Sequence, residues 1–481
     1  MLRHPISTSE TSAGARAREP LRKTPVSDHD SRLDTPIQSD ADFYAVFHEA
    51  EKPKEKWLIG AEMEKFGILE RTGEPLRYEG DYGVVRIMRD LESRGRWSPV
   101  YEREGGPAIA LTRGESSITL EPGSQFELSG APLPTIHAIS TEFRNHMAEL
   151  APISTELGIR WIGLGFHPFA KRSDLGFVPK GRYAIMREYL PTRGGLALDM
   201  MLRTCTVQAN FDYGSERDAL RKMRVGLKLS PLTTAMFANS PWYEGAAMGE
   251  LTHRGRVWLD MDPDRSGLVP SLWSEGAGYR EYIEWALDVP MFLFKRGDKV
   301  VANTGQTFRA FWKGGYGGHR ATLADWSLHL NTLFPEVRLK STIEVRGADS
   351  QGRANWCALP ALWTGLYYDD RALEGAEELT AGWRHEEVAA IRADVAKRGI
   401  RAEFRGKPMV DLALRVIELA DGGLARRART REDGKDERVH LAQLRLLVEK
   451  GLTPADRLLE GMDDVKDFRR EVMARADLAG A

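Results

Sequence analysis

The sequence predicts an α+β fold in which a mainly antiparallel sheet is followed by a mostly helical C-terminal part. Two observations lead to this prediction. From Trp57 to about Tyr368, strand-like runs are followed in turn by helical runs, and no linker interrupts them. In the strand-like runs, apolar and polar side chains follow each other with a period of two residues. After Asp369, apolar residues recur at spacings of three and four, which is typical of helices packed on one face.

Ordered chain is expected to begin with a helix at about Asp42–Glu51 and a strand from Trp57. Residues 1–40 are rich in Ser, Thr, Pro and charge and have almost no apolar periodicity, so we expect a disordered extension. Residues 41–481 are expected to form a single domain, of which about 370–481 is mostly helical.

Three helices are expected in the C-terminal part, at Glu386–Lys397, Met409–Ala420 and Val439–Lys450. The stretch Arg426–Arg438 carries mixed charge, and we interpret it as a mobile connector rather than a binding site for an anionic partner.

Composition excludes several classes of function. The chain has 68 Lys+Arg against 70 Asp+Glu, so nothing in its charge favours nucleic acid or an anionic membrane as a partner. No apolar run approaches the ~18 residues that a membrane-spanning helix needs. The two cysteines, Cys205 and Cys357, indicate a reducing compartment. The Ser and Arg content of the N-terminus suits a transit peptide, but its early acids do not, and a cytoplasmic location is predicted.

Four strand-like runs each have one apolar face and one face suited to metals, phosphate or small polar substrates. In the first, Ile59–Ile68, Glu62 and Glu64 share a face with their Cα atoms roughly 6.6 Å apart. Two such carboxylates suit Mg²⁺, which prefers hard oxygen ligands. A Glu-x-Glu pair is common on solvated strands, so this pair alone predicts no site.

The second run, Ser117–Ser129, contains Glu121 before a Pro-Gly turn and then Gln125 and Glu127. The pattern predicts a hairpin with a polar side that can hold a second cation or position a substrate. In the third run, Leu198–Tyr213, uncharged polar groups share one face, which favours a wet cavity over bulk solvent; a polar ladder between sheets remains the alternative. These groups are Thr204, Thr206, Gln208 and Asn210.

The fourth run, Arg338–Asp349, aligns Lys340, Glu344 and Arg346 on one face. Such alternation is found on salt-bridged exteriors. It also supplies what phosphoryl transfer needs, namely a carboxylate for Mg²⁺ and cations that neutralise the transferred group.

Between the second and third runs, Arg182 and Tyr183 lie in and just after a glycine-containing turn, where an arginine can clamp a carboxylate. His167 is a weak candidate ligand, since a buried structural histidine explains it equally well. The sequence has no phosphate-loop, dinucleotide, zinc-protease or serine-hydrolase motif. If ATP binds, metal ions and sheet side chains must hold its phosphates.

Together these segments resemble the glutamate–cysteine ligases of plants and many proteobacteria. The resemblance runs from about Trp57 to Met462 and includes IGAEMEKFGI, SITLEPGSQFELSGAPL, VPKGRYAIM, LALDMMLRTCTVQANFDY and FPEVRLKSTIEVRGAD. It implies a curved, mainly antiparallel sheet of the glutamine synthetase type with helices on its convex side. It also implies that ATP phosphorylates the γ-carboxylate of glutamate and that the cysteine amine displaces phosphate, as the first step of glutathione synthesis.

The resemblance implies roles for particular residues. Two or more Mg²⁺ ions, with Mn²⁺ as an alternative, are expected beside the co-substrate ATP, and Gln125 is a further candidate ligand. Arg346 is expected to steady the transferred phosphoryl group with help from Lys340. The acids expected to hold the metal are Glu62, Glu64, Glu121, Glu127 and Glu344. The residues expected on the amino-acid side are Arg182, Tyr183, Arg203, Thr204, Thr206 and Arg254.

The chain departs from the plant pattern in its cysteines. Cys357 is similar to one disulfide cysteine of that pattern, but Ser140 occupies the expected partner position, and the second cysteine pair is absent from Phe311–Asp325. We therefore expect no redox switch, and a monomer or weak homodimer. The alternatives are a ligase of this fold acting on another amine, a magnesium-dependent hydrolase, and an inactive binding protein.

Overall fold

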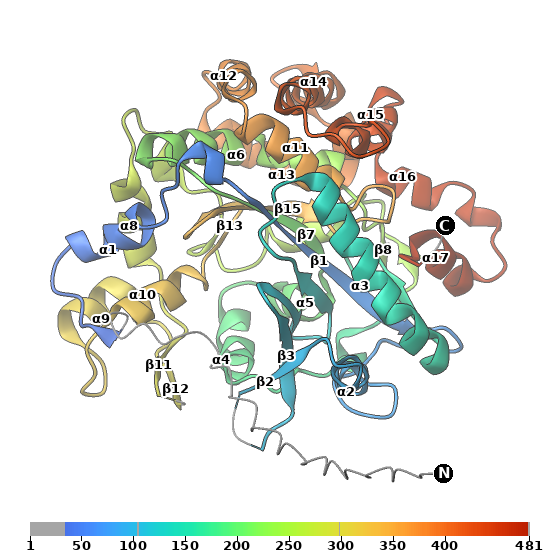
Figure 1. The fold of residues 1–481 in the computed structure, drawn as a ribbon, viewed down its shortest axis with the longest axis horizontal. Coiled ribbons are helices and arrows are strands. Elements are labelled where there is room, and N and C mark those ends of the chain that lie inside the picture. The colour runs from blue at the N-terminus through green and yellow to red at the C-terminus, as the bar shows by residue number, and fades with distance from the viewer. Residues whose placement is uncertain (1–33, 103–104, 298, 480–481) are drawn as a thin grey trace, which may run out of the picture.

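The computed structural model describes residues 34–102, 105–297 and 299–479, and its centre is a nine-stranded sheet (Figure 1). Eight strands follow the order β14-β15-β7-β1-β5-β4-β3-β2, and β6 pairs with the last residues of β1. Every pairing in this sheet is antiparallel, as predicted. The strands are β1 (Ile59–Leu69), β2 (Ser98–Tyr101), β3 (Ala108–Arg113), β4 (Ser116–Leu120), β5 (Phe126–Ser129), β6 (Ile159–Ile162), β7 (Thr206–Phe211), β14 (Val337–Leu339) and β15 (Ile343–Asp349).

One face of the sheet is covered by helices in two layers (Figure 1). This confirms the expectation that helices pack on one side of the sheet. Helices α3, α6 and α11 contact β1, β15 and β7, and α12, α14 and α15 lie outside them. Local signals fix α3: the Thr135 hydroxyl caps its first turn, and Gly158 ends it in the left-handed region at φ 65°. These helices are α3 (Ile136–Leu157), α6 (Glu216–Met236), α11 (Ala358–Tyr367), α12 (Asp370–Leu379), α14 (Met409–Arg427) and α15 (Ala442–Glu449).

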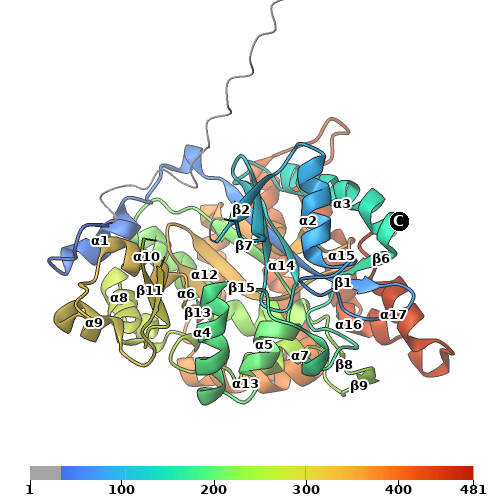
Figure 2. The same cartoon turned by 90° about the horizontal axis from the view of Figure 1, so that it is seen from below.

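Further helices lie on the other face, where they enclose a cavity. Helices α4, α5 and α7 are seen together below β7 and β15 in Figure 2, and α7 contacts both α5 and β15. They are α4 (Gly181–Tyr189), α5 (Ala197–Arg203) and α7 (His253–Val257). We did not predict them, because each is shorter than three turns and its apolar pattern is interrupted by polar residues that face the cavity.

The remaining elements surround this centre. The other helices are α1 (Ala41–His48), α2 (Val84–Ser93), α8 (Tyr279–Asp288), α9 (Phe308–Gly314), α10 (Leu323–Leu330), α13 (His385–Arg398), α16 (Pro454–Leu459) and α17 (Phe468–Ala476). Four small two-stranded sheets pair β8 (Trp242–Tyr243) with β9 (Ala246–Ala247), β10 (Ser266–Gly267) with β13 (Phe334–Pro335), β11 (Leu293–Arg296) with β12 (Lys299–Ala302), and β16 (Glu403–Phe404) with β17 (Lys407–Pro408).

The start of the described chain is already paired. The Ile37 amide donates to the Ala321 carbonyl at 3.0 Å, and the Leu323 amide donates to the Thr35 carbonyl at 3.2 Å. Thr35 and Ile37, which we placed in the extension, are therefore hydrogen-bonded to the rest of the chain. The rest of the predicted extension, residues 1–33, lies outside the described residues.

Two expected strands and one expected connector differ from the structure. Residues 338–349 form a hairpin, since β14 turns back at Lys340 so that Leu339 pairs with Ile343. In residues 198–213, the first part is helix α5 and only the second part is strand. In the connector, the fully buried Glu437 accepts a hydrogen bond from the Ile136 amide at 2.7 Å, so that end is fixed to α3.

No helix among the described residues is long and apolar enough to span a membrane. Cys205 and Cys357 are both buried and unbridged. Burial raises the pKa of the Cys357 thiol to about 12, despite a hydrogen bond with Ser140 that opposes the shift. Cys357 and Ser140 are therefore neighbours, as the resemblance implies, but serine cannot form the disulfide.

Candidate active site

A cavity of about 420 Å³ lies between the sheet and helices α4, α5 and α7. Its volume is in the range of sites for small-molecule substrates. Its wall contains all the site residues predicted from the sequence except Arg203: Glu62, Glu64, Glu121, Gln125, Glu127, Arg182, Tyr183, Thr204, Thr206, Arg254, Lys340, Glu344 and Arg346. Segments separated by almost 300 residues thus meet around one space.

Strand register brings the carboxylates of the cavity together. On β1, Glu62 lies opposite Gln208 of β7, and Glu64 lies opposite Glu127 of β5. The Glu62 carboxylate accepts hydrogen bonds from the side-chain amides of Gln208 and Asn210, both at 2.9 Å. The Glu64 carboxylate accepts one from the Thr206 backbone amide at 2.8 Å. Neutral donors therefore orient both carboxylates without neutralising them.

The β4–β5 hairpin supplies the next acids. The Glu127 carboxylate accepts hydrogen bonds from Thr119 Oγ1 at 2.5 Å and Ser129 Oγ at 2.8 Å. Glu121 follows β4 and lines the same cavity. Gln125 has a different role, because its amide nitrogen donates to the carbonyls of Met201 and Thr204 and its oxygen accepts from the Gly123 amide. We infer that Gln125 fixes the turn against α5 rather than serving as a metal ligand.

Three of these acids hold protons more tightly than ordinary carboxyls. Burial raises the pKa of Glu62 to about 8, and the charges of Glu344 and Glu127 add to the effect. Although Glu62 is partly accessible from the cavity, it lies deep in the molecule. Burial and neighbouring carboxylates also raise the pKa values of Glu64 and Glu121. The three acids therefore bind protons where other positive charge is lacking, and a cation bound in the cavity could replace those protons.

Glu344 differs from the other acids because its charge is already neutralised. Its carboxylate pairs with Arg338 at 2.6 and 3.0 Å, with Arg346 at 3.1 Å and with Lys340 at 3.4 Å. Burial alone would raise the pKa of Glu344, but the charges of Arg338, Lys340 and Arg346 outweigh it and hold that pKa well below its usual range. The structure thus puts Glu344 among cations, whereas we expected it among metal ligands.

The donor set fits magnesium better than a metal that requires a complete protein cage. Among the described residues, no group of three or more His, Cys, Asp or Glu side chains is close enough to form a ready-made metal site. Mg²⁺ usually takes only one or two carboxylates and completes its shell with water and substrate phosphate. Glu62, Glu64, Glu121 and Glu127 provide carboxylates of this kind on one side of the cavity.

The residues predicted on the amino-acid side lie on short elements. Arg182 and Tyr183 are in the first turn of α4, and Arg182 donates to the Tyr183 hydroxyl at 3.0 Å. The hydroxyls of Thr204 and Thr206 donate to the carbonyls of Met200 and Ala348, at 2.7 and 2.6 Å. Arg254, on α7, is 4 % exposed, and no hydrogen-bond partner from the described part of the chain reaches its Nε.

Arg203 does not line the cavity. Its side chain is fully buried and pairs with Asp199 and, at 2.8 Å, with Glu244. It belongs to an internal ion-pair network at the end of helix α5, whereas the resemblance implied a place for it near the amino-acid pocket. His167 is also structural: its Nδ1 accepts from the Ala170 amide at 3.0 Å.

We did not predict several wall residues. Arg338 donates to both oxygens of Glu344 and to the carbonyls of Asn331 and Leu333. The positive charge of Arg338 and its distance along the chain from Glu344 were visible in the sequence, but the hairpin that brings the two side chains together was not. Trp258, Asn331, Thr332 and Phe334 also line the cavity and carried no signal beyond ordinary composition.

The chain is similar to known proteins along most of its length. Residues 58–475 match the sequence model of the family described as glutamate-cysteine ligase family 2. The chain is 43 % identical over 411 residues to glutamate–cysteine ligase B of Oryza sativa subsp. japonica, covering 85 % of this chain and 81 % of the relative. It is 44 % identical over 412 residues to the Brassica juncea enzyme, covering 85 % and 78 %.

A solved structure shares the fold at low sequence identity. The glutamate–cysteine ligase of Francisella tularensis, determined in complex with AMP, superposes with a TM-score of 0.55 over 87 % of each chain at 12 % identity. The predicted fold class is confirmed by this match together with the antiparallel sheet.

The comparisons contradict the predicted cytoplasmic location. The relatives from Oryza sativa, Brassica juncea and Arabidopsis thaliana are named as chloroplastic enzymes. The prediction was wrong because it rested on few cysteines and on acidic residues near the N-terminus. A low cysteine count indicates a reducing environment and does not distinguish one reducing compartment from another.

Proposed function

This chain belongs to glutamate–cysteine ligase family 2, and we propose that it joins the γ-carboxylate of L-glutamate to the amine of L-cysteine at the expense of ATP. The product is the dipeptide from which glutathione is built. The observation that carries the proposal is a single cavity with two chemically distinct sides. On one side, Glu62, Glu64, Glu121 and Glu127 form no ion pair with a described cationic side chain, and on the other Arg338, Lys340 and Arg346 surround Glu344.

The four carboxylates would hold Mg²⁺ or Mn²⁺, and Glu344 would hold the cations in place. Divalent ions bound there would neutralise the triphosphate and withdraw charge from its terminal phosphorus. The buried carboxylates support this assignment because no cationic side chain in the described ranges forms an ion pair with them. Burial, and then the neighbouring carboxylates, raise the pKa values of Glu62, Glu64 and Glu121.

The reaction needs no protein nucleophile. A γ-carboxylate oxygen of glutamate attacks the terminal phosphorus of ATP, the bond to ADP breaks, and γ-glutamyl phosphate forms. Arg346 and Lys340 would stabilise charge on the group in transfer. The cysteine amine then attacks the acyl carbon, phosphate leaves with the bonding electrons, and the amine loses a proton. The protein aligns the reactants and excludes water that would hydrolyse the acyl phosphate.

The amino-acid side would use Arg182 and Arg254. A guanidinium binds carboxylates with two parallel hydrogen bonds, and the buried Nε of Arg254 has no acceptor among the described residues. Tyr183, Thr204 and Thr206 complete this wall. Since the hydroxyl of Thr206 already donates a hydrogen bond to the Ala348 carbonyl, Thr206 would contribute to the pocket through its packing and its backbone groups.

The proposal is tested by measuring ADP release by purified protein with ATP, Mg²⁺ and glutamate, with the amine varied. We expect turnover with cysteine to exceed turnover with serine, alanine and glycine. Hydroxylamine in place of cysteine should yield γ-glutamyl hydroxamate, since it traps the acyl phosphate. Equal turnover with another amine would favour the alternative, a ligase of the same fold with a different amine substrate. ATP-independent release of product would contradict both.

A further inference from the structure

Strand β15 ends at a buried carboxylate that does not reach the cavity. Asp349 is 1 % exposed, and no step of the proposed reaction uses it. One of its oxygens accepts hydrogen bonds from the Asn239 amide and the Ser240 hydroxyl, both at 2.7 Å, and the other accepts from the Thr252 hydroxyl at 2.9 Å. Such charge-assisted bonds in a dry interior are strong.

The hydroxyls that bind Asp349 also hold the start of helix α7. Ser240 Oγ accepts from the Arg254 backbone amide at 3.2 Å, and Thr252 Oγ1 accepts from the Gly255 amide at 2.9 Å. Helix α7 has only five residues, too few to be stable by itself. These contacts therefore help to set its position, together with its packing against α13.

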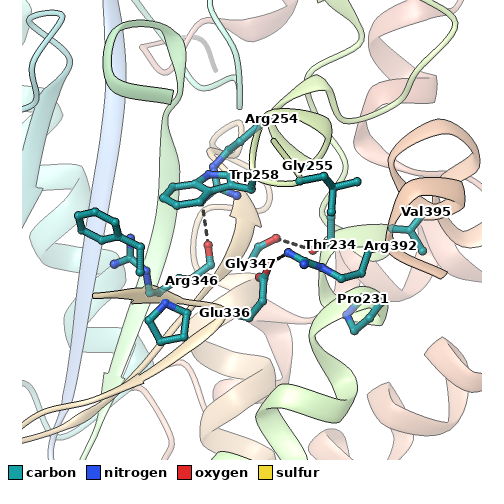
Figure 3. A pocket seen from close by; sticks show the side chains of 13 residues that line it. Pro231, Thr234, Arg254, Gly255, Trp258, Glu336, Arg346, Gly347, Arg392 and Val395 are labelled. Carbon is teal, nitrogen blue, oxygen red and sulfur yellow. Dashed lines mark hydrogen bonds and ion pairs between the residues drawn. The ribbon is translucent and has the colours of Figure 1, made fainter. Parts of the chain in front are cut away.

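The side chain of Arg254 returns to the same strand. Its Nη2 donates to the Arg346 carbonyl at 2.9 Å, as Figure 3 shows. A closed circuit results, running from Asp349 through Ser240 to the Arg254 amide and from the Arg254 side chain back to Arg346. Thr252 gives the helix a second link to Asp349, through the Gly255 amide. Behind it lies a chamber of about 20 Å³, which has room for about one water molecule.

Packing leaves Asp349 little freedom. A Cβ atom built on Gly165 would lie 2.2 Å from the carboxyl carbon of Asp349, so the chain passes this group at a distance that only glycine allows. The carboxylate is thus held both by donors and by contact.

We propose that Asp349 is a positioning residue that fixes Arg254 relative to Arg346 and thereby sets the affinity for glutamate. The inference rests on the proposed function, in which Arg254 binds the substrate's carboxylate. The Nε of Arg254 is buried at the cavity wall without an acceptor among the described residues, and the orientation of this side chain depends on a helix anchored to Asp349.

A double-mutant cycle with steady-state kinetics tests this proposal. We expect Asp349→Asn to raise KM for glutamate about 10-fold, a magnitude typical of a disturbed buried hydrogen bond, and to leave KM for ATP within about twofold. In an Arg254→Ala background, Asp349→Asn should change KM for glutamate by less than about twofold, since the group through which it acts is gone.

Two results would overturn the inference in distinguishable ways. If the effects of Asp349→Asn and Arg254→Ala multiply, Asp349 does not act through Arg254, and the proposed function stands. If Arg254→Ala leaves KM for glutamate unchanged, the substrate role of Arg254 in the proposed function fails, and the inference fails with it.

Ser240→Ala gives a second variant in case Asp349→Asn does not fold, because it removes one link of the circuit and keeps the carboxylate. It should raise KM for glutamate about threefold and also lose its effect in the Arg254→Ala background. Asp262→Asn is the matched structural control, since Asp262 is fully buried and pairs with Arg265. It should lower the melting temperature without changing either KM.

Discussion

At the scale of single residues, the cavity glutamates differ in whether a cation already matches their charge. Glu344 has three cationic neighbours, whereas Glu62 and Glu64 are oriented by neutral amides. The same side-chain type therefore has two roles in one site. In the proposed function their environments separate these roles: the unpaired acids would attract metal ions, and the paired acid would hold cationic side chains where phosphate charge develops.

We predict that Glu344→Gln lowers turnover by at least about 100-fold while the protein remains folded. The change removes the charge that holds Arg338, Lys340 and Arg346 together, and such a loss is typical of removing a transition-state charge partner. Steady-state kinetics and circular dichroism would measure it.

Glu437→Gln is the control for this variant. Glu437 is equally buried and pairs with Arg427 at 3.2 Å, but it caps α3 outside the cavity. It should reduce stability and leave turnover near normal. Near-normal turnover by Glu344→Gln would remove Glu344 from the proposed site.

Metal affinity should rise with pH. The pKa of Glu62 is raised to about 8 without metal, so below that pH metal binding must displace a proton. For one displaced proton, affinity for Mg²⁺ should increase about tenfold per pH unit from about pH 6 and level off near pH 8. Calorimetric titration across this range would measure the slope.

The raised pKa of Glu62 should make the stability of the metal-free protein fall with pH, whereas metal affinity rises. A carboxyl whose folded pKa exceeds its unfolded pKa is protonated in the folded state while the unfolded chain is ionised, so its contribution to stability falls as pH rises from about 4.5 to about 8. Glu62→Gln should flatten both dependences. A metal affinity that is independent of pH in the unmodified protein would contradict the assignment.

At the scale of elements, the periodic helices of the C-terminal part were predicted and the short helices around the cavity were not. The expected helices at 386–397, 409–420 and 439–450 correspond to α13, α14 and α15, and the expected strand from Trp57 corresponds to β1. Helices α4, α5 and α7 were missed because helices this short show too few repeats of the apolar pattern to be recognised. The turn at Lys340 was missed because Lys-Ser-Thr is not a strong turn signal.

The candidate site followed the same rule. Alternation identified acids such as Glu62, Glu64 and Glu127, since period two holds wherever the strand is regular. It overlooked Arg338, which reaches the site only through the hairpin. Arg203 was expected from the resemblance instead, and the structure places it in helix α5, away from the cavity wall. The resemblance to a known family, rather than periodicity, supplied the topology that joins these runs.

The β4–β5 turn gives a prediction at this scale. A Cβ atom on Gly123 would lie 2.4 Å from the Leu202 carbonyl oxygen, so Gly123→Ala should force the turn away from α5. Because Glu121 and Gln125 flank the glycine, we expect a stability loss of about 1–3 kcal/mol together with weaker Mg²⁺ binding. Chemical denaturation and metal titration would measure both.

Gly176→Ala is the matched control for the turn, since nothing lies within 4 Å of a Cβ atom there. It should leave stability and metal binding unchanged. Unaltered metal binding by a destabilised Gly123→Ala would separate the turn from the site.

At the scale of the whole molecule, the cavity depends on chain segments that are distant in sequence. Strand β1 contributes the first acids, β15 contributes the cations almost 300 residues later, and β7 lies between them. A site of this kind forms only when the whole sheet has formed. Its catalytic integrity and global folding should therefore be lost together on denaturation, and a monomer or weak homodimer remains our prediction for its assembly.

Near the C-terminal end, the chain bonds to strand β6, whose partner in the sheet is β1. The Leu478 amide donates to the Trp161 carbonyl of β6 at 2.8 Å, and the Leu478 side chain is 1 % exposed. We expect Leu478→Ala to lower the free energy of unfolding by about 2–5 kcal/mol, the usual cost of emptying a buried leucine site, without changing KM for any substrate. The exposed Leu446, at 43 %, is the control: Leu446→Ala should stay within about 0.5 kcal/mol. Denaturant titrations of both variants would measure the free energies of unfolding. A changed KM in a Leu478→Ala protein of normal stability would contradict the prediction, because it would mean that Leu478 affects the active site by a route other than stability.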